Sequence, residues 1–499
     1  MKLETILKQR FGYASFRPGQ KEVITSVLSG KSTVAMLPTG TGKSLCYQLP
    51  GYLLEGQVII ISPLLSLMQD QAEQLMLNGE KKVIAFNSFL THEEKKQSLM
   101  NLSKYKFIFI SPEMLHFEAV LNRLKKLKIA LFVVDEAHCI SQWGYDFRPD
   151  YLKLGEIRKQ LGRPLTMALT ATATPEVKED IKKSLYITSS NEFIFSVDRP
   201  NISLKVEHLS SYREKNERLV ELTKRLQGPG IIYFSSKKMA EQTAEHLKKH
   251  GIGRVMSYHG GMSQENRILV QQQFIHGQLD LICATSAFGM GINKENIRYV
   301  IHFHMPLQME SYLQEIGRAG RDGDNSIAIF LYAPGDEQLP YQLAESEVPD
   351  GIQLDWIKGW LKENKGVLAN LSQYEEQIRL LSGLTETQWR VFEDSFHRKY
   401  KMGLEIERIF DEMKTYNQIR LESKRQSIEE VYRWISINKC RRQHILSHFN
   451  EKKTEVIENC CDICGLEFNF FTQKNNKENQ ENLLYDWKNH LQALLIPGE

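Results

Sequence analysis

The stretch "LPTGTGKSLCYQ", residues 37–48, decides the fold of the first part of this chain. An apolar run at residues 33–37 predicts a buried strand, and Gly42, Lys43 and Ser44 stand where a helix would begin. Glycines allow backbone N–H groups to approach a phosphate, and a helix N-terminus favours an anion. Lys43 would reach the β- and γ-phosphates of a nucleotide, and the Ser44 hydroxyl would bind Mg²⁺. The predicted phosphate-binding residues are Pro38, Thr39, Gly40, Thr41, Gly42, Lys43 and Ser44.

One position of this loop departs from the strict P-loop pattern. The pattern requires a glycine separated from Gly42 by four residues, and this chain has Leu37 there. A glycine-rich turn without a ligand is therefore the alternative interpretation. The spacing of the remaining residues and the motifs that follow favour phosphate binding.

The run "VVDEAH", residues 133–138, ends a predicted strand with acidic side chains. The carboxyl ends of parallel strands meet at one edge of a sheet, so these side chains would lie beside the phosphate-binding loop. Asp135 would hold Mg²⁺ through water, and Glu136 would orient or deprotonate the attacking water. His138 is the third predicted catalytic residue of this run. A solvated acidic pair at a strand end is the alternative.

A third motif, "QEIGRAGRDG" at residues 314–323, carries Gln314 and the arginines Arg318 and Arg321. We expect the two arginines to lie on a helix of a second domain. Phosphoryl transfer develops negative charge, and arginines offered by a separate element stabilise it. An isolated arginine pair is usually a solvated surface, but the preceding Gln314 and the presence of two sheet domains favour a catalytic role.

Composition places the chain among soluble globular proteins. It has 499 residues, 41% hydrophobic and 25% charged, and its formal net charge of +3 does not by itself indicate a nucleic-acid partner. The length suggests about three domains. No apolar run approaches the ~20 residues of a membrane span, and the N-terminus lacks the features of a secretory signal. These features predict a cytosolic protein with no membrane association.

Short apolar runs alternate with helical patterns as far as about residue 335, which predicts an α/β fold with parallel sheets covered on both faces. The first predicted strands are residues 33–37, 58–62, 107–111, 131–135 and 167–171. The second series is residues 230–236, 280–286, 299–305 and 327–333. The polar stretch 196–203 between the two series is the predicted hinge. From about residue 345 to 435, apolar residues recur at spacings of three and four, which predicts helices.

Four further motifs join the three described above. They are "FGYASFRPGQ" (11–20), "ALTATAT" (168–174), "SYHGGMS" (257–263) and "ATSAFGMGINK" (284–294). All seven follow the order found in the RecQ family of superfamily-2 helicases, and the chain resembles that family across both α/β regions. The resemblance implies two tandem RecA-like domains, at residues 1–200 and 201–345, that close on ATP and Mg²⁺.

The resemblance also implies roles for individual residues. Arg17 would stack on the adenine and Gln20 would read its edge. Thr170 and Thr172 would link the domains through hydrogen bonds near Asp135, with a strand-end cap as the alternative for these threonines. Phosphate contacts that track a nucleic-acid strand without reading its sequence would come from residues 62–71, 111–115, 235–241 and 257–263.

The stretch "QWGYDFRP", residues 142–149, resembles the aromatic-rich loop of the family. Its predicted DNA-contacting residues are Trp143, Tyr145, Phe147 and Arg148. Rings and an arginine can stack on or clasp the bases of a single strand, at ~1–3 kcal/mol per base. The loop begins six residues after Glu136, so DNA contact there would reposition catalytic groups. The family commonly has His where this chain has Tyr145, which does not titrate near neutral pH. An aromatic plug packed on the second domain is the alternative.

The C-terminal cysteines resemble the zinc module of the family, within a predicted module at residues 436–470. The predicted zinc ligands are Cys440, Cys460, Cys461 and Cys464. The family's remaining ligand would fall at Glu458, three residues before Cys461, and Cys460 is the substitute that we expect. Four thiolates would give a closed tetrahedral Zn²⁺ site. A module held by apolar packing without metal is the alternative.

A helical insertion at residues 346–435 and a short tail at residues 471–499 are the remaining predicted parts. The family's winged helix would follow the zinc module, and the tail is too short to form one. We therefore expect the insertion either to supply a basic, ring-bearing surface that blocks the second DNA strand or only to buttress the second lobe. The candidate contact residues are Trp389, Arg390, Phe392, His397, Arg398 and Lys399.

The resemblance implies an ATP-dependent DNA helicase that moves 3′ to 5′ on single-stranded DNA and unwinds duplex in DNA recombination, repair or replication. Tailed or forked DNA would be the substrate, and a single-stranded-DNA-binding protein and repair or replication factors would be partners. The protein would be cytoplasmic and associated with the nucleoid or chromosomal DNA. A DNA-stimulated ATPase that remodels or anneals strands without robust unwinding is the alternative, and an RNA helicase is a third.

Overall fold

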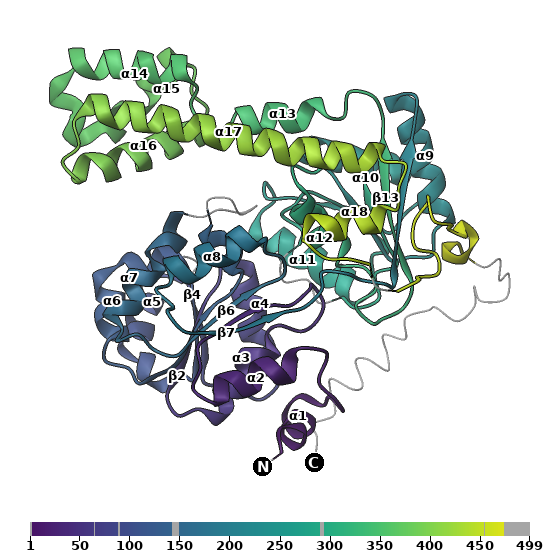
Figure 1. Cartoon of the computed structure of the whole chain (residues 1–499), viewed down its shortest axis with the longest axis horizontal. Helices are drawn as coiled ribbons and strands as arrows, with labels where there is room; N and C mark the ends of the chain where they lie inside the picture. Colours follow the sequence, from purple (N-terminus) through teal and green to yellow (C-terminus); the bar gives the residue numbers. More distant parts are fainter. Residues whose placement is uncertain are drawn as a thin grey trace.

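A computed structural model describes residues 2–63, 65–87, 90–141, 149–289, 294–453 and 455–473, and every structural statement concerns these residues. Two sheets follow one another along the chain, and a helical projection extends from the second (Figure 1). We call residues 3–194, from α1 to β7, the first lobe, and residues 202–345, from β8 to α13, the second lobe. None of the described helices is long and apolar enough to cross a membrane.

The first lobe is built on seven parallel strands in the order β3-β4-β2-β5-β6-β1-β7. The strands are β1 Thr33–Met36, β2 Gln57–Ile61, β3 Val83–Phe86, β4 Phe107–Ile110, β5 Ile129–Val134, β6 Thr166–Thr170 and β7 Asn191–Ile194. The helices are α1 Leu3–Phe11, α2 Gln20–Leu28, α3 Leu45–Leu53, α4 Leu65–Leu77, α5 His92–Met100, α6 Glu118–Leu124, α7 Leu154–Gln160 and α8 Pro175–Ser184. Val34 and Met36 join one buried cluster and Ala35 joins another, so both faces of the sheet are covered.

The second lobe repeats this arrangement with six parallel strands in the order β10-β11-β9-β12-β13-β8. The strands are β8 Ile202–His208, β9 Gly230–Tyr233, β10 Val255–Tyr258, β11 Leu281–Ala284, β12 Tyr299–His302 and β13 Ser326–Tyr332. The helices are α9 Tyr212–Arg225, α10 Lys237–Lys249, α11 Gln264–Ile275, α12 Met309–Ile316 and α13 Gln338–Glu345. The predicted α/β fold with two parallel sheets is therefore confirmed.

The structure contains four strands that the sequence did not predict, and all four lie at the edges of the sheets. They are β3 and β7 in the first sheet and β10 and β8 in the second. An edge strand has one unpaired side and meets more solvent, so it tolerates polar residues such as Glu192 in β7 and Lys205 in β8. The predicted hinge 196–203 is also too long, because β8 already begins at Ile202.

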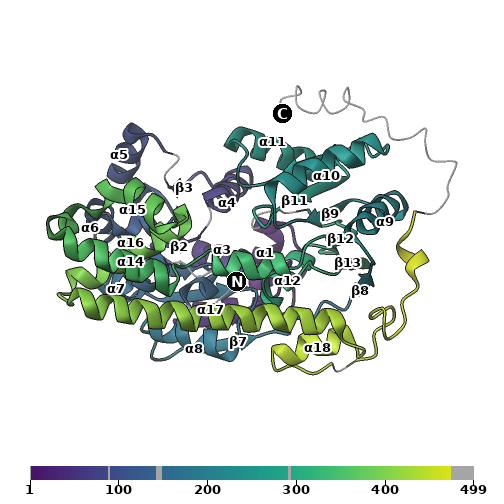
Figure 2. The same ribbon diagram turned by 90° about the horizontal axis from the view of Figure 1, so that it is seen from above.

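Residues 351–417 form a separate body with its own core, which we call the helical unit. It comprises α14 Gly351–Glu363, a 3₁₀ segment Lys365–Tyr374, α15 Glu375–Ser382, α16 Glu386–Lys401 and the first part of α17 Ile406–Ser436. With 31 residues and a rise of ~1.5 Å per residue, α17 is about 46 Å long. It runs from the second lobe to the helical unit, which extends over the side of the first lobe that carries α6 and α7 (Figures 1 and 2).

The expectation that α16 offers a basic, ring-bearing surface is wrong. Trp389 and Phe392 are fully buried in the core of the helical unit, because they lie on the apolar face of an amphipathic helix. The basic residues pair with neighbouring acids: Arg398 donates to Asp394 at 2.7 Å, and Lys399 pairs with Glu412. The expectation that this helix buttresses the second lobe is also not met, since its apolar face packs within the helical unit.

The chain then returns to the second lobe through the end of α17 and α18 Arg441–His448. The segment that follows lies along β8 and covers this edge of the second sheet. Leu204 N–H donates to the Cys460 carbonyl at 3.2 Å, and Asp462 N–H donates to the Leu204 carbonyl at 3.0 Å. The cysteine segment is thereby anchored to the first strand of the second lobe.

Candidate active site

The predicted phosphate-binding loop connects β1, which ends at Met36, to α3, which begins at Leu45. Gly40 and Gly42 have φ angles of 89° and 73°, a region that other residues rarely adopt. The amide of Gln20 donates to the carbonyls of Thr41 at 2.7 Å and of Gly42 at 3.1 Å. Arg17 donates to the carbonyl of Gly40. Arg17 and Gln20, which were predicted to contact adenine, therefore hold the backbone of the phosphate-binding loop.

The departure at Leu37 has a structural explanation. The Leu37 side chain is fully buried between β1 and α2, where a glycine would leave a gap. Its N–H donates to the Thr170 carbonyl at 3.0 Å, so the residue extends the pairing of β1 with β6. The loop bends only after this point, at the glycines that follow, and the missing first glycine does not prevent the turn.

The acids Asp135 and Glu136 directly follow β5, beyond Val134. Glu136 has a φ angle of 46°, and its N–H donates to Asp135 Oδ1 at 3.0 Å. Lys43 Nζ lies 3.9 Å from Glu136 Oε1, which places the loop lysine beside the acids. Burial, and secondly the charge of Glu136, raise the pKa of Asp135 to about 7, while Lys43 lowers it. A divalent cation at this position would favour the ionised carboxylate.

His138 links the acidic pair to β6. This strand lies in the sheet between β5, which precedes the acids, and β1, which leads into the phosphate-binding loop. Its Nδ1 lies 2.9 Å from Thr170 Oγ1 and 3.4 Å from Glu136 Oε2. The Thr170 hydroxyl donates its single proton to the carbonyl of Thr172 at 2.9 Å, so it accepts from His138. These bonds of Thr170 stay within the first lobe, and the Thr172 hydroxyl has no hydrogen-bond partner among the described residues. The predicted link between the domains through these two threonines is therefore not found in the described part of the chain.

The two arginines of the third motif face this edge from the second lobe, together with Gln314, which lines the same cleft. The helix α12 ends at Ile316, so the expectation that Arg318 and Arg321 lie on a helix is wrong. Glycines at 317 and 320 turn the chain, and Gly320 has a φ angle of 55°. Arg318 donates to the carbonyl of Gly289.

Arg321 lies against the phosphate-binding loop. A Cβ atom on Gly40 would approach Arg321 Cγ to 2.9 Å, so the loop fits this side chain because it has glycine there. Burial, and secondly the neighbouring Arg318, lower the pKa of Arg321 to about 9. A polyanion in the cleft would relieve both effects. The lobes are therefore arranged to bring cationic groups to one bound polyphosphate.

These residues line one cleft between the lobes with a volume of about 270 Å³. Its cationic side chains are Arg17, Lys43, Arg318 and Arg321, and its carboxylates are Asp135, Glu136 and Glu295. The Ser44 hydroxyl and the Asp135 carboxylate supply oxygen donors of the kind that Mg²⁺ prefers. The donor set fits a nucleoside triphosphate with its metal ion.

The sequence did not predict Glu295, which lies in the cleft and pairs with Arg17 at 3.3 Å, or Arg199 at the edge of the cleft. Its guanidinium donates to the Thr39 carbonyl of the first lobe at 2.9 Å and to the Gly317 carbonyl of the second lobe at 3.0 Å. An arginine before a proline in a polar stretch is typical of an exposed linker. Nothing in the local sequence indicates these partners, which come from positions more than a hundred residues away.

The predicted DNA-contacting loop, Trp143, Tyr145, Phe147 and Arg148, lies outside the described residues. Asp150, which follows it, pairs with His116 at 2.7 Å, and His116 ends a 3₁₀ turn that begins at Pro112. The serines expected to touch phosphates at 62 and 111 are buried at strand ends, whereas Lys237 and Lys238 are exposed. The structure therefore leaves the lysines, rather than these serines, available to a nucleic-acid backbone.

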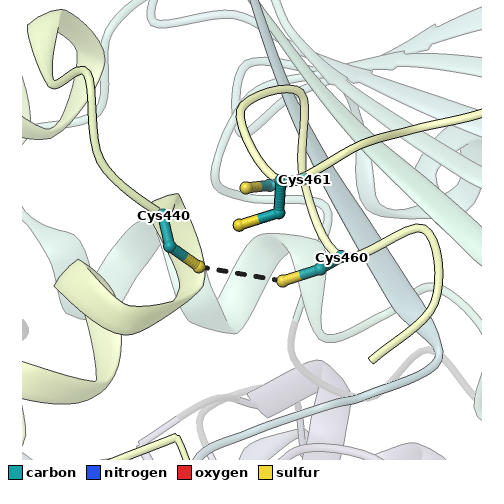
Figure 3. A group of neighbouring side chains, drawn as sticks. Cys440, Cys460 and Cys461 are labelled. Atoms are coloured by element: carbon teal, nitrogen blue, oxygen red, sulfur yellow. Dashed lines mark hydrogen bonds between the residues drawn. The ribbon is translucent and has the colours of Figure 1, made fainter. Parts of the chain in front are cut away.

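The four C-terminal cysteines lie together, and Figure 3 shows three of them labelled. The Sγ atoms of Cys440, Cys460, Cys461 and Cys464 all lie within 4.8 Å of one another. The Sγ atoms of Cys440 and Cys460 are 3.8 Å apart. Tetrahedral zinc with bonds of ~2.3 Å places its sulfurs about 3.8 Å apart, so the thiols fit this metal. Cys460 takes the expected place in the cluster, and Glu458 is exposed.

A hydrogen bond from Cys460 lowers the pKa of the Cys461 thiol to about 4, and backbone N–H groups act in the same direction. Lys453 Nζ lies 3.3 Å from Cys460 Sγ and adds a positive charge beside the cluster. The hydrogen bond between Cys460 and Cys461 raises the pKa of the Cys460 thiol, and burial raises the pKa of Cys464 to about 11, so without a metal ion these groups favour one thiolate, at Cys461. A metal ion binds cysteine as thiolate.

Three family models match the chain. DEAD/DEAH box helicase matches residues 17–181, and the helicase conserved C-terminal domain matches residues 214–323. RecQ zinc-binding matches residues 404–465, a range that contains all four clustered cysteines. The matches thus cover both halves of the cleft and the cysteine segment.

Two curated relatives are similar over different lengths. The chain is 45% identical over 485 residues to the "Probable ATP-dependent DNA helicase RecS" of Bacillus subtilis, which covers 95% of this chain and 94% of that protein. It is 41% identical over 333 residues to the ATP-dependent DNA helicase RecQ of Haemophilus influenzae, which covers 66% of this chain and 53% of that protein. The chain therefore spans nearly all of the first relative and about half of the second.

The fold also resembles solved helicase structures. The Mycobacterium smegmatis helicase Lhr, bound to single-stranded DNA and AMP-PNP, superposes with a TM-score of 0.56 at 21% identity, over 76% of this chain and 55% of that one. This likeness confirms two RecA-like lobes.

Proposed function

Because the chain belongs to the RecQ family of ATP-dependent DNA helicases, we propose that it moves 3′ to 5′ along single-stranded DNA and unwinds tailed or forked duplexes. We place this activity on chromosomal DNA, in recombination, repair or replication. A single-stranded-DNA-binding protein and repair or replication factors are the partners that such a substrate implies.

One observation carries the proposal for ATP hydrolysis: the two lobes bring the loop lysine, the acidic pair and two arginines to a single cleft. Lys43 is then the residue that contacts the β- and γ-phosphates, and Glu136 orients the attacking water. Arg318 and Arg321 stabilise the charge that develops on the transferred phosphoryl group. Ser44 and Asp135 would hold Mg²⁺, which would offset the negative charge of the phosphates.

The remaining cleft residues have supporting roles in this proposal. Arg17 and Gln20 shape the phosphate-binding loop and line the end of the cleft where the adenine would lie. His138, bonded to Thr170, fixes the orientation of Glu136. Gln314 faces the same cleft from α12 and would contact the attacking water or the γ-phosphate.

Strand displacement tests the direction and the substrate. Three substrates share one duplex sequence: a DNA duplex with a 3′ tail, a DNA duplex with a 5′ tail and an RNA duplex with a 3′ tail. Each is incubated with and without ATP and Mg²⁺. We expect displacement of the 3′-tailed DNA alone, only with ATP, and none by Lys43→Ala. Displacement from the 5′ tail would reverse the direction, and displacement of the RNA would make the protein an RNA helicase. ATP hydrolysis that DNA stimulates without displacement of a strand would indicate that the protein remodels strands and does not unwind them.

We also propose that Trp143 and Phe147 couple DNA to ATP hydrolysis, as the family's aromatic-rich loop implies. The loop follows Glu136 closely in the sequence, and Asp150, the residue after it, pairs with His116 at 2.7 Å. Trp143→Ala should keep the basal ATPase rate and lose the stimulation by single-stranded DNA. Stimulation equal to that of the wild type would limit the loop to packing.

The cysteine cluster is proposed to hold one structural Zn²⁺, because its four sulfurs have the spacing of a tetrahedral site. Metal analysis after desalting should find about one zinc per chain. The double variant Cys461→Ser, Cys464→Ser should lose it, whereas Cys283→Ser, buried in β11, should keep it. Wild-type protein without metal would show that the module is held by packing alone.

A further inference from the structure

The segment between the lobes, residues 195–201, does more than connect them. We call it the hinge segment. It carries Arg199, whose guanidinium donates four hydrogen bonds to backbone carbonyls. The acceptors are Thr39 at 2.9 Å, Gly317 at 3.0 Å, Ala319 at 3.0 Å and Gly320 at 2.7 Å. The first belongs to the phosphate-binding loop, and the other three belong to the turn that carries the arginines of the second lobe.

The two lobes approach closely at this point. A Cβ atom on Gly317 would lie 3.1 Å from Thr39 Cβ, so the backbones nearly touch. Asn201, at the end of the hinge segment, donates to the carbonyls of Gly320 at 2.8 Å and of Asp324 at 2.9 Å. The hinge segment therefore fixes the turn of the second lobe, and its bond to Thr39 joins this turn to the phosphate-binding loop of the first lobe.

The cysteine module holds the same segment from the opposite side. Arg442 lies two residues after Cys440 and is only 3% exposed. It donates to the Asp198 carboxylate, the Arg199 carbonyl at 3.0 Å and the Ile202 carbonyl. Glu451, beyond α18, accepts from the N–H of Val197 at 3.1 Å and from the Ser196 hydroxyl. The backbone of the hinge segment is thus held over most of its length.

We propose that Arg199 is a positioning residue that couples closure of the nucleotide cleft to the cysteine module, with Arg442 as its support. This inference rests on the proposed function, in which the cleft is the ATP site. The side chain of Arg199 holds the loop and the arginine turn at their closed separation, and Arg442 holds the main chain of Arg199. Arg199 reaches the phosphate-binding loop at Thr39, ahead of Lys43 and Ser44, whereas three of its four bonds hold the turn that presents Arg321.

The experiment compares Arg199→Gln, Arg442→Gln and the double variant in the full chain. Steady-state ATP hydrolysis with saturating single-stranded DNA gives kcat and KM for each. We expect Arg199→Gln to lower kcat about tenfold and to change KM by less than about threefold, since it removes an interaction needed only for the closed state. Arg442→Gln should lower kcat about threefold. The double variant should be no slower than Arg199→Gln, because both changes break one link.

Arg441→Gln is the matched control. Arg441 is the same residue type, adjacent in sequence and 2% exposed, but it contacts Asp462 and the carbonyls of Trp434 and Ile435 rather than the hinge segment. When Arg441→Gln is combined with Arg199→Gln in one chain, the two fold-decreases in kcat should multiply. Zinc content and the melting temperature are measured for every variant, and zinc content should stay unchanged in Arg199→Gln.

Two results would overturn the coupling in an active protein. One is an increase in KM with kcat unchanged in Arg199→Gln. The other is a decrease of kcat in the variant with both Arg199→Gln and Arg442→Gln that equals the product of the two single decreases. If Arg442→Gln melts below the assay temperature, Arg442→Lys is judged by the same criteria, because it retains the charge and loses the geometry of the guanidinium. A wild-type chain without ATP hydrolysis would instead refute the proposed function.

Discussion

The nucleotide cleft and the helical unit use charged side chains in opposite ways. In the helical unit, Arg398 and Lys399 lie at the surface beside acidic partners, and the rings are buried beneath them. In the cleft, Arg318 is buried and Arg321 is partly buried, and burial together with the neighbouring Arg318 lowers the pKa of Arg321. Exposed pairs contribute little and report a solvated surface, whereas like charges brought together in a cleft favour an anion bound between them. The comparison predicts that equal changes have unequal effects in the two regions.

The largest effect should come from removing the carboxylate of Glu136. Glu136→Gln should lower kcat by about 10³-fold or more while ATP binding persists, because only the group that orients the water is lost. Glu412→Gln, which removes a carboxylate paired with Lys399 in the helical unit, should change kcat by less than about twofold. ATPase rates and binding of a fluorescent ATP analogue measure both. A near-normal rate for Glu136→Gln would show that another group orients the water.

The second effect compares two arginines. Arg321→Gln should lower kcat by about 10²–10³-fold, since removing one donor that stabilises transition-state charge costs about this much. Arg398→Gln should be indistinguishable from the wild type in ATP hydrolysis and melting temperature, because its partner Asp394 is exposed. If unwinding, measured separately, fell in Arg398→Gln while ATPase stayed normal, the helical unit would contribute to strand separation after all.

The third effect concerns the independence of the helical unit. Trp389→Ala should destabilise its core by about 3–5 kcal/mol, because a fully buried indole is replaced by a cavity. Single-stranded-DNA-stimulated ATPase at 25 °C should change less than about twofold, since the cleft residues lie in the lobes. Urea denaturation followed by circular dichroism should show an early helical transition. A single transition that coincides with loss of ATPase would show that the two regions unfold together.

The smallest effect concerns a contact between the lobes. Asp70 of α4 accepts from Gln271 of α11 at 2.8 Å, and burial raises its pKa from 3.8 to about 6. An acid with a raised folded pKa stabilises the fold at low pH, and this contribution disappears as the pH rises through about 6. Asp70→Asn cannot ionise, so it should be more stable than the wild type at pH 8, by on the order of 1 kcal/mol.

The gain from Asp70→Asn should shrink towards pH 5, where the wild-type carboxyl is largely protonated. Asp411→Asn, an exposed change in the helical unit, serves as the control and should show no such dependence on pH. Thermal melts across this pH range measure both variants. A constant difference at all pH values would mean that Asp70 acts only through its hydrogen bond.

The central strands and the cleft motifs were predictable because their signals are local. A buried parallel strand is a continuous apolar run, and Lys43, Asp135 and Glu136 directly adjoin such runs. The edge strands gave weaker signals, since Asn191 and Glu192 of β7 meet solvent. The end of α12 was also missed: its pattern continues towards Arg318, but the turn at Gly317 and Gly320 ends the helix.

The two α/β lobes, the phosphate-binding loop, the acidic pair, the arginine motif and all four clustered cysteines could be identified from the sequence, because each is a run of neighbouring residues with recognisable chemistry at fixed spacing. The positions of the rings of α16 and the contacts of Arg199 became known from the folded structure. These outcomes depend on groups far apart in the chain, such as Arg199 with Thr39 and Gly317. Local pattern carries no information on such pairs, since packing of the two lobes and the helical unit selects them.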